Sequence, residues 1–351
     1  MSEERSPNRL LQLDVLRGVA AVSVLIFHYT ARFDQLYGHA PSMVLIDVGR
    51  RGVDLFFVIS GFVIIMTIEK TRRGLDFVVS RFSRLFPAYW VAIALTFLIV
   101  NVAGLPGREV TARVALANLS MLPAFFKIPY VDSVYWTLTL ELSFYAIIFA
   151  LYELRMLSRI ELVCAGWLML LLGVKVAGER WGVRLPYLIE LLVLQGYAQL
   201  FVAGMIIHEI HQRGFSFSRA TILIGCILMQ WYTQGSMAGI VAVISIAGVF
   251  AATRSWLRWL EVRPLLFLGT ISYSLYLIHQ NIGYVVFRAC YARGFNNYLG
   301  IAMAAAVAIS LATVMTFVIE RPAMRAIRDW YRRFFRTSDI VSSPAARELR
   351  V

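Results

Sequence analysis

Three ionisable residues lie within one apolar stretch near the start of the sequence, residues 10–33. They are Asp14, Arg17 and His28. An α-helix turns by about 100° per residue, so Arg17 and His28 differ by about 20° around the axis and by about 16 Å along it. A charge inside a bilayer is costly unless it faces a cavity or a partner. We expect a polar site inside a membrane protein, or alternatively a polar stripe that only joins helices.

Further polar groups occur inside later apolar stretches. Glu141 lies at a depth similar to that of His28, where a carboxylate either orients or charge-balances the imidazole or pairs with an arginine. Tyr276 and His279 belong to an unusually polar stretch, residues 269–284. Its polar face suits a sugar-like ligand or a water-filled cavity, although His279 would also serve as a plain helix–helix hydrogen bond.

Arg81 and Arg84 are three residues apart and therefore share one face of a helix. Their guanidinium groups suit phosphate, although basic residues are also expected at the cytoplasmic end of a span. We expect Pro87 to open the span that follows them. Asp54 lies one turn inside another apolar stretch and either contacts a ligand or pairs with the arginines just before it. A ligand with phosphates at one end and a reactive group near His28 would use both regions.

The elements that carry these residues are membrane spans. The chain has 351 residues, of which 59% are hydrophobic and 16% charged, and this composition excludes a soluble globule. The net charge of +13 does not indicate nucleic-acid binding, because the basic residues lie mostly between the apolar stretches. We predict an all-α, polytopic bundle of about ten transmembrane helices. The expected spans are 10–30, 50–68, 85–103, 135–153, 160–177, 186–207, 220–233, 236–253, 264–287 and 297–319.

Lysine and arginine decide the topology. With the N-terminus inside, ten spans place most of these residues in cytoplasmic segments, as the positive-inside rule requires. If 220–233 and 236–253 formed one span, nine spans would put the arginine-rich C-terminus outside. We therefore predict that both termini are cytoplasmic. Residues 1–322 would form the membrane domain, with Pro322 ending the last helix, and 323–351 a short basic cytoplasmic tail.

Cysteine and histidine spacing gives no metal signature. Cys164, Cys226 and Cys290 are far apart and lie in or beside apolar stretches, which is typical of packing residues. His208 and His211 are three residues apart, but no third ligand is evident. We expect no metal site.

The ordered motifs resemble the membrane-bound acyltransferase-3 family, the O-acyltransferases of bacterial surface and secreted glycans. The resemblance extends over nearly the whole chain and depends on several motifs in a fixed order. These are Arg17 followed after ten residues by His28, GVDLFFVISGF (52–62), Arg81 with Arg84, YWTLTLELSFY (135–145) with Glu141, SYSLYLIH (272–279), and Glu320-Arg321-Pro322.

The resemblance implies an enzyme of the bacterial inner membrane. Its donor would be cytoplasmic acyl-CoA, most often acetyl-CoA, with no permanently bound cofactor. Its acceptor would be a hydroxyl of a carbohydrate or glycolipid, and its other partners would be membrane lipids and glycan-assembly proteins, not nucleic acid.

On that basis each candidate residue receives an expected role. Arg81, Arg84 and Arg17 would hold the phosphates, His28 would act as general base or acyl carrier, and Glu141 would tune His28. Asp54, Tyr276 and His279 would contact substrate. The alternative is a transporter or flippase that uses the same polar stripe as a pathway.

Overall fold

The computed structural model describes residues 10–38 and 44–336, and all secondary structure within these ranges is helical. The all-α prediction is therefore confirmed for the described residues. The α-helices are α1 (Leu11–Phe27), α2 (Phe33–Tyr37), α3 (Gly52–Ile68), α4 (Gly74–Ala103), α5 (Ala112–Asn118), α6 (Trp136–Glu153), α7 (Ile160–Trp181), α8 (Tyr187–Leu192), α9 (Ala198–Arg213), α10 (Phe217–Gln234), α11 (Ser236–Thr253), α12 (Arg263–Ala292), α13 (Asn297–Val314) and α14 (Arg321–Tyr331).

Seven helical segments within the described ranges are long and apolar enough to cross a membrane. The helices α9, α10 and α12, which correspond to three of the ten expected spans, are not among them. α9 has only 16 residues, and α12 carries many polar side chains that it buries inside the bundle. The seven segments are Leu11–Tyr37, Val48–Ile68, Gly74–Ala103, Ser133–Glu153, Leu157–Trp181, Ser236–Thr253 and Asn297–Phe335.

The sixth expected span, 186–207, is wrong as a continuous helix. The structure has the short helix α8, then a turn, then α9. Leu194 and Gly196 both have positive φ in this turn, a backbone conformation that an α-helix does not contain. The chain was expected to be helical here because the segment is mostly apolar, and apolar composition does not reveal a turn.

Two prolines do not mark the helix ends that the sequence predicts. Pro87 lies inside α4, which already begins at Gly74. A proline inside a membrane-embedded helix loses one backbone hydrogen bond, which neighbouring groups can replace. Pro322 lies in the first turn of α14, where its missing N–H costs little. Helical structure therefore continues past Pro322 to Arg336, and the rest of the predicted tail lies outside the described residues.

The seventh and eighth expected spans are separate helices, α10 and α11. Gly235 between them has a φ of 89°. Gly239 packs directly against Trp231, so the chain folds back on itself at this glycine. The segment therefore forms two helices rather than one continuous helix, and the prediction that each of them spans the membrane stays a prediction.

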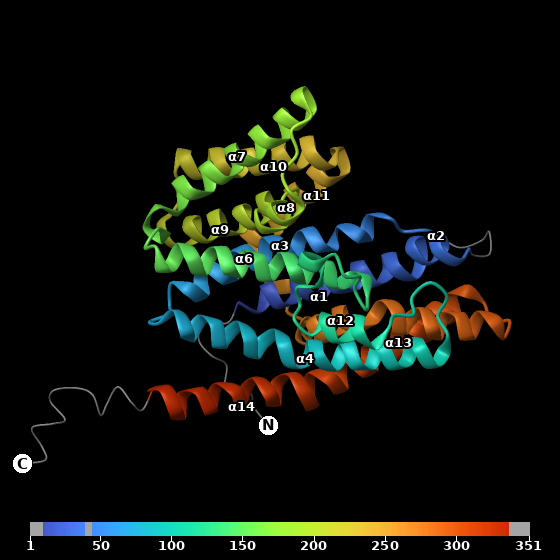
Figure 1. Ribbon diagram of the computed structural model, residues 1–351. Coiled ribbons are helices and arrows are strands. Elements are labelled where there is room, and N and C mark those ends of the chain that lie inside the picture. The colour runs from blue at the N-terminus through green and yellow to red at the C-terminus, as the bar shows by residue number, and fades with distance from the viewer. Residues whose placement is uncertain (1–9, 39–43, 337–351) are drawn as a thin grey trace, which may run out of the picture.

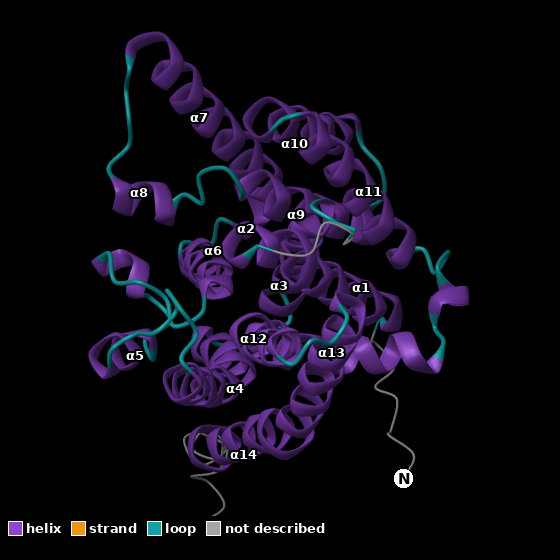
Figure 2. Ribbon diagram, turned by 90° about the vertical axis from the view of Figure 1, so that its right-hand side faces the viewer, coloured by secondary structure: helices purple, strands orange, loops and turns teal. Residues whose placement is uncertain are grey.

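The helices form successive layers (Figures 1 and 2). α7 and α10 lie on one side of the bundle and α14 on the opposite side, with α1, α3 and α12 between them. Gly61 and Gly204 let α3 and α9 touch, because a Cβ on either glycine would collide with the backbone of the other helix. The three cysteines are buried and unpaired.

Candidate active site

Close contact between α1 and α12 creates the site. A Cβ on Gly18 would collide with the backbone of α12, and a Cβ on Gly269 would collide with that of Asp14. The two helices run side by side in the same direction, so residues farther along them also meet. In this way His28 of α1 lies against His279 of α12, with the ring centroids 4.9 Å apart.

One cavity of about 100 Å³ lies between α1, α3, α4, α6 and α12. Its lining includes Arg17, Arg81 and Arg84, the three arginines singled out in the sequence, together with Glu141. We call it the arginine cavity. Helices that are far apart in sequence thus bring the three guanidinium groups to one place, as the phosphate-binding prediction requires.

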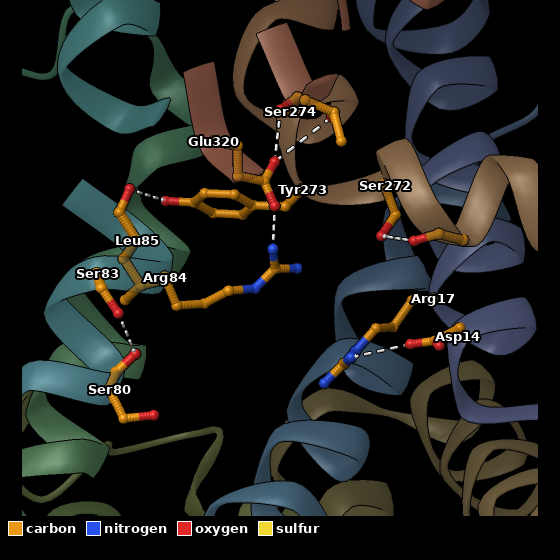
Figure 3. A network of polar contacts seen from close by, with 12 residues as sticks. Asp14, Arg17, Ser80, Ser83, Arg84, Leu85, Ser272, Tyr273, Ser274 and Glu320 are labelled. Atoms are coloured by element: carbon orange, nitrogen blue, oxygen red, sulfur yellow. Dashed lines mark hydrogen bonds and ion pairs between the residues drawn. The ribbon is translucent and has the colours of Figure 1, made fainter. Parts of the chain in front are cut away.

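Two of these arginines have carboxylate partners (Figure 3). Arg84 forms an ion pair with Glu320, which also accepts a hydrogen bond of 2.8 Å from Ser274 Oγ. Arg17 pairs with Asp14 at 3.4 Å. The two guanidinium groups extend from opposite sides toward the same space. A buried guanidinium needs such a partner, because desolvation penalises an isolated charge.

Arg81 differs from the other two, because it forms no ion pair with a carboxylate in the part of the chain that the structure describes. One of its terminal nitrogens donates to Ser80 Oγ at 3.1 Å, and its buried Nε has no hydrogen-bond partner there. The guanidinium carbon lies 6.0 Å from the centre of the Tyr145 ring. Of the three arginines, Arg81 is the one whose charge is not already neutralised by an acid.

Glu141 does not contact His28. Its carboxylate accepts hydrogen bonds from Ser60 Oγ at 2.9 Å and from the Tyr145 hydroxyl at 2.6 Å. Glu141 therefore belongs to the arginine cavity. The geometric expectation that it orients His28 is not met.

A second cavity of about 320 Å³ contains His28 and is lined also by Arg32, Ser133, Trp136 and Gln280. We call it the histidine cavity. It lies farther along α1 than the arginine cavity. Thus Arg17 and His28 face two neighbouring cavities rather than one.

The backbone carbonyls around the two histidines fix where their protons lie. His279 Nδ1 lies 2.9 Å from Tyr276 O, and His28 Nδ1 lies 2.8 Å from Val24 O. A carbonyl oxygen only accepts, so both Nδ1 atoms carry hydrogen. His279 Nε2 then has a free lone pair 3.1 Å from His28 Nδ1, whose single N–H is shared between this nitrogen and Val24 O. His28 Nε2 is left as a lone pair with no hydrogen-bond partner among the described residues.

Side chains from other parts of the chain hold the backbone around His279 by hydrogen bonds. His28 begins a π-helical segment, His28–Arg32, and such segments are frequent at functional sites. The Tyr29 hydroxyl donates to His279 O at 2.6 Å. Asp132 accepts a hydrogen bond of 3.0 Å from the backbone N–H of Asn281, and burial raises the pKa of this carboxyl group, in the loop before α6, to about 7. These contacts position His279 from both sides.

The other predicted ligand-binding residues have mixed positions. Asp54 is fully buried and lies 3.6 Å from Arg51 and 3.4 Å from the Gln230 amide, and it lines neither cavity. This geometry agrees with the second of the two expectations for Asp54, that it pairs with a neighbouring arginine. Tyr276 lines both cavities, whereas His279 reaches the histidine cavity only through His28.

Sequence reasoning missed Arg328, which lies beyond Pro322 in the predicted tail. Its Nε donates to Ser83 Oγ at 3.1 Å, and a terminal nitrogen lies 3.4 Å from Ser80 O, so α14 packs along α4 close to Arg81. A signal was present in the sequence: Met324, Ile327 and Tyr331 recur at helical spacing, as on an amphipathic helix that packs against protein.

A group of potential metal ligands lies away from both cavities. Atoms of Glu69, His208 and Glu209 lie within 4.8 Å of one another, without His211. Arg213 lies 3.2 Å from Glu209, so a cation is already present beside this group. We assign it no metal.

Comparison with known proteins places these residues in a family. Residues 10–320 match the acyltransferase domain of the acyltransferase-3 family. The chain is 30% identical to the exopolysaccharide production protein ExoZ of Rhizobium meliloti (strain 1021), over 79% of this chain and 90% of that protein. It is 26% identical to nodulation protein 10 of Rhizobium leguminosarum bv. viciae, over 92% of this chain and 96% of that protein.

No solved structure matches the chain. The family match covers both the arginine cavity and the histidine pair, and it extends from the start of α1 to Glu320. The chain therefore belongs to the acyltransferase-3 family and is an O-acyltransferase.

Proposed function

We propose that the protein transfers an acyl group, most often acetyl, from cytoplasmic acyl-CoA to a hydroxyl of a surface or exported carbohydrate. The observation that carries this proposal is the place of His28, which contacts Val24 O and His279 through Nδ1 and lines a cavity next to one lined by three arginines. A base and a phosphate-binding region are what transfer from a CoA thioester needs. The relative ExoZ, named for exopolysaccharide production, supports a carbohydrate acceptor.

The proposed setting is the bacterial inner membrane, with ten spans and both termini in the cytoplasm. Support comes from the helical hairpin at Gly235 and from the arginines of α14. α14 lies along the first part of α4, where Arg73 donates to Phe335 O at 3.4 Å. This end of the bundle is rich in arginine, so the positive-inside rule favours a cytoplasmic location. The arginine cavity would then be nearer the cytoplasm than the histidine cavity.

In the arginine cavity, the donor phosphates would meet Arg81, whose guanidinium pairs with no carboxylate among the described residues. Arg17 would add positive charge from the opposite wall, although it shares its charge with Asp14. Arg84 is held by Glu320, so its first role is to join α4 to the π-helical segment Met315–Glu320 that follows α13. Charge-assisted hydrogen bonds from guanidinium to phosphate are among the strong ones.

In the histidine cavity, His28 Nε2 would take the proton of the acceptor hydroxyl. The freed oxygen attacks the thioester carbonyl carbon, so a C–O bond forms and the C–S bond breaks. The CoA sulfur leaves as a thiolate and receives the proton from the imidazolium. His279 stabilises the imidazolium, because its Nε2 accepts the hydrogen bond from His28 Nδ1.

Mass spectrometry of surface and secreted glycans tests this proposal. A deletion strain should lack an acyl mass increment that wild-type cells carry, and the wild-type gene should restore it. Membranes from the complemented strain should also release CoA from acetyl-CoA when the deacylated glycan is added. Identical glycans in the two strains, together with no CoA release, would contradict the proposal and favour a transporter.

A further inference from the structure

The helix α14 lies beside the first part of α4 (Figures 1 and 2). Arg328 of α14 makes two contacts with α4 there. Its Nε donates to Ser83 Oγ at 3.1 Å, and its Nη2 lies 3.4 Å from Ser80 O. Ser80 Oγ also accepts a hydrogen bond of 3.1 Å from Arg81 Nη2. Ser80 is therefore a common partner of two arginines, one from each helix.

Arg81 and Arg328 form a pair of positive charges that no acid neutralises. Neither of them makes an ion pair with a carboxylate among the described residues. The charged groups that act most strongly on Arg328 are Arg81, Arg84 and Arg332, which are all cations. Like charges in a partly buried place repel one another, so this arrangement becomes favourable when an anion binds beside it.

Both guanidinium groups keep hydrogen-bond donors for such an anion. A guanidinium has five N–H groups, and the contacts with Ser80 and Ser83 use only two of those of Arg328. Its Nη1 has no partner in the described part of the chain and is not a buried atom. Arg81 donates only to Ser80, and its Nε is buried without a partner. Forked N–H groups of this kind match the oxygens of a phosphate.

The two arginines differ in their place relative to the arginine cavity. Arg81 lines this cavity and Arg328 does not. Arg328 contacts Ser80 and Ser83, which precede Arg84 on α4 and so lie nearer the cytoplasm in the proposed topology. A CoA thioester also has its phosphates in two places. The diphosphate continues the pantetheine arm, whereas the 3′-phosphate branches from the ribose at the end farthest from the thioester. A diphosphate held in the arginine cavity would therefore leave the 3′-phosphate on the side of Arg328.

We infer that Arg328 binds the 3′-phosphate of the acyl-CoA donor beside Arg81, so that the enzyme prefers thioesters of CoA to those of dephospho-CoA. This inference rests on the proposed function and adds a donor-binding residue to it. Arg328 lies beyond residues 10–320, the part of the chain that matches the family domain. The helix α14 would thus belong to the donor site as well as to the packing of the bundle.

The test measures KM for acetyl-CoA and for acetyl-dephospho-CoA with the same membranes, and release of free thiol in the presence of deacylated glycan is the readout. Loss of a charge-assisted contact with phosphate weakens binding by about tenfold or more. Wild-type protein should therefore have a KM about tenfold or more lower for acetyl-CoA than for acetyl-dephospho-CoA. Arg328→Ala should raise KM for acetyl-CoA by a similar factor and leave KM for acetyl-dephospho-CoA nearly unchanged.

Two further variants separate phosphate binding from packing and from overall charge. Arg328→Gln removes the charge but keeps an amide that can donate to Ser83, and it should lose the preference as Arg328→Ala does. The matched control is Arg325→Ala, which removes an arginine from the same helix at an exposed residue that bonds only to the backbone of Arg321. It should keep the wild-type ratio of the two KM values. This ratio does not depend on how much of a variant folds, because both donors meet the same protein.

Three results overturn the inference while the proposed function stands. The first is an equal KM for the two donors with wild-type protein. The second is a wild-type ratio of KM values in Arg328→Ala or Arg328→Gln. The third is an equal rise of KM for both donors in these variants, which would assign Arg328 to the packing of α14 alone. If wild-type protein releases thiol from neither donor, the proposed function itself fails and the inference fails with it.

Discussion

The two cavities that share Tyr276 differ in how their central polar side chains are bonded. In the arginine cavity the groups are charged, and Arg17 and Arg84 are matched with carboxylates. In the histidine cavity, His28 and its partner His279 are bonded to backbone carbonyls and to each other. Charges that stay charged suit the binding of an anion, whereas a neutral imidazole with a free lone pair suits proton transfer.

A single helix, α1, carries Arg17 to one cavity and His28 to the other, so donor binding and proton transfer would take place in separate cavities. Arg17 and His28 share a face of α1, and the linings of their two cavities have Val53 and Tyr276 in common. We therefore expect substitutions in the arginine cavity to act on KM for the donor, and substitutions of the histidine pair to act on kcat.

The largest effect is expected at His28. His28→Ala removes the proton acceptor, and general-base catalysis contributes about 10²–10⁴-fold, so kcat should fall by that factor. Binding of acyl-CoA should persist. The measurement is the initial rate of CoA release against donor concentration, with protein level checked by immunoblot. A raised KM with an unchanged kcat would reverse the roles of the two cavities.

A smaller effect is expected at Arg81. Arg81→Ala removes a charge-assisted hydrogen bond to the donor phosphates that is worth about 1.5–3 kcal/mol. The KM for acyl-CoA should therefore rise by about tenfold or more. The value of kcat at saturating donor should change little. Arg113, which is exposed and lies outside both cavities, is the matched control, and Arg113→Ala should behave as wild type. An unaltered KM in Arg81→Ala would mean that this arginine serves topology only.

The smallest effect is expected at His279, which touches His28 and not the substrate. His279→Ala removes one hydrogen bond to His28 Nδ1, worth about 1 kcal/mol, so kcat should fall by roughly tenfold or less. His279→Gln should recover part of the loss, because its amide oxygen can accept from Nδ1. The pH profile of kcat should also shift in His279→Ala. If His279 served packing alone, the pH profile of kcat would stay unchanged in His279→Ala, and His279→Gln would have the same kcat as His279→Ala.

Periodicity predicted the local part of the site. The spacing of Arg17 and His28 places them on one helix face, and both line cavities as expected. The pairing of His28 with His279 was not predicted, because 251 residues separate them and only the packing of α1 on α12 brings them together. The depth of Glu141 left open whether it meets His28 or an arginine, because depth does not specify which neighbour a side chain contacts.

Hydropathy predicted the positions of most of the long helices. Most expected spans coincide with helices, including the separate pair α10 and α11. Hydropathy gave no sign of the turn before α9. The helix end expected at Pro322 is absent, because a π-helical segment, Met315–Glu320, leads directly into α14. The return of α14 along α4 depends on tertiary contacts such as that of Arg328 with Ser83, which no hydropathy profile contains.

Sided membrane vesicles test the central claim, that the acyl group passes from an arginine cavity near the cytoplasm to His28 near the outer face. Acetyl-CoA, which does not cross membranes, is added outside vesicles that contain the deacylated glycan. Inside-out vesicles with wild-type protein should acetylate the enclosed glycan, and right-side-out vesicles should not. Inside-out vesicles with His28→Gln should also fail, because an amide cannot accept a proton at neutral pH. Equal acetylation in both orientations, or normal acetylation by His28→Gln, would contradict the account.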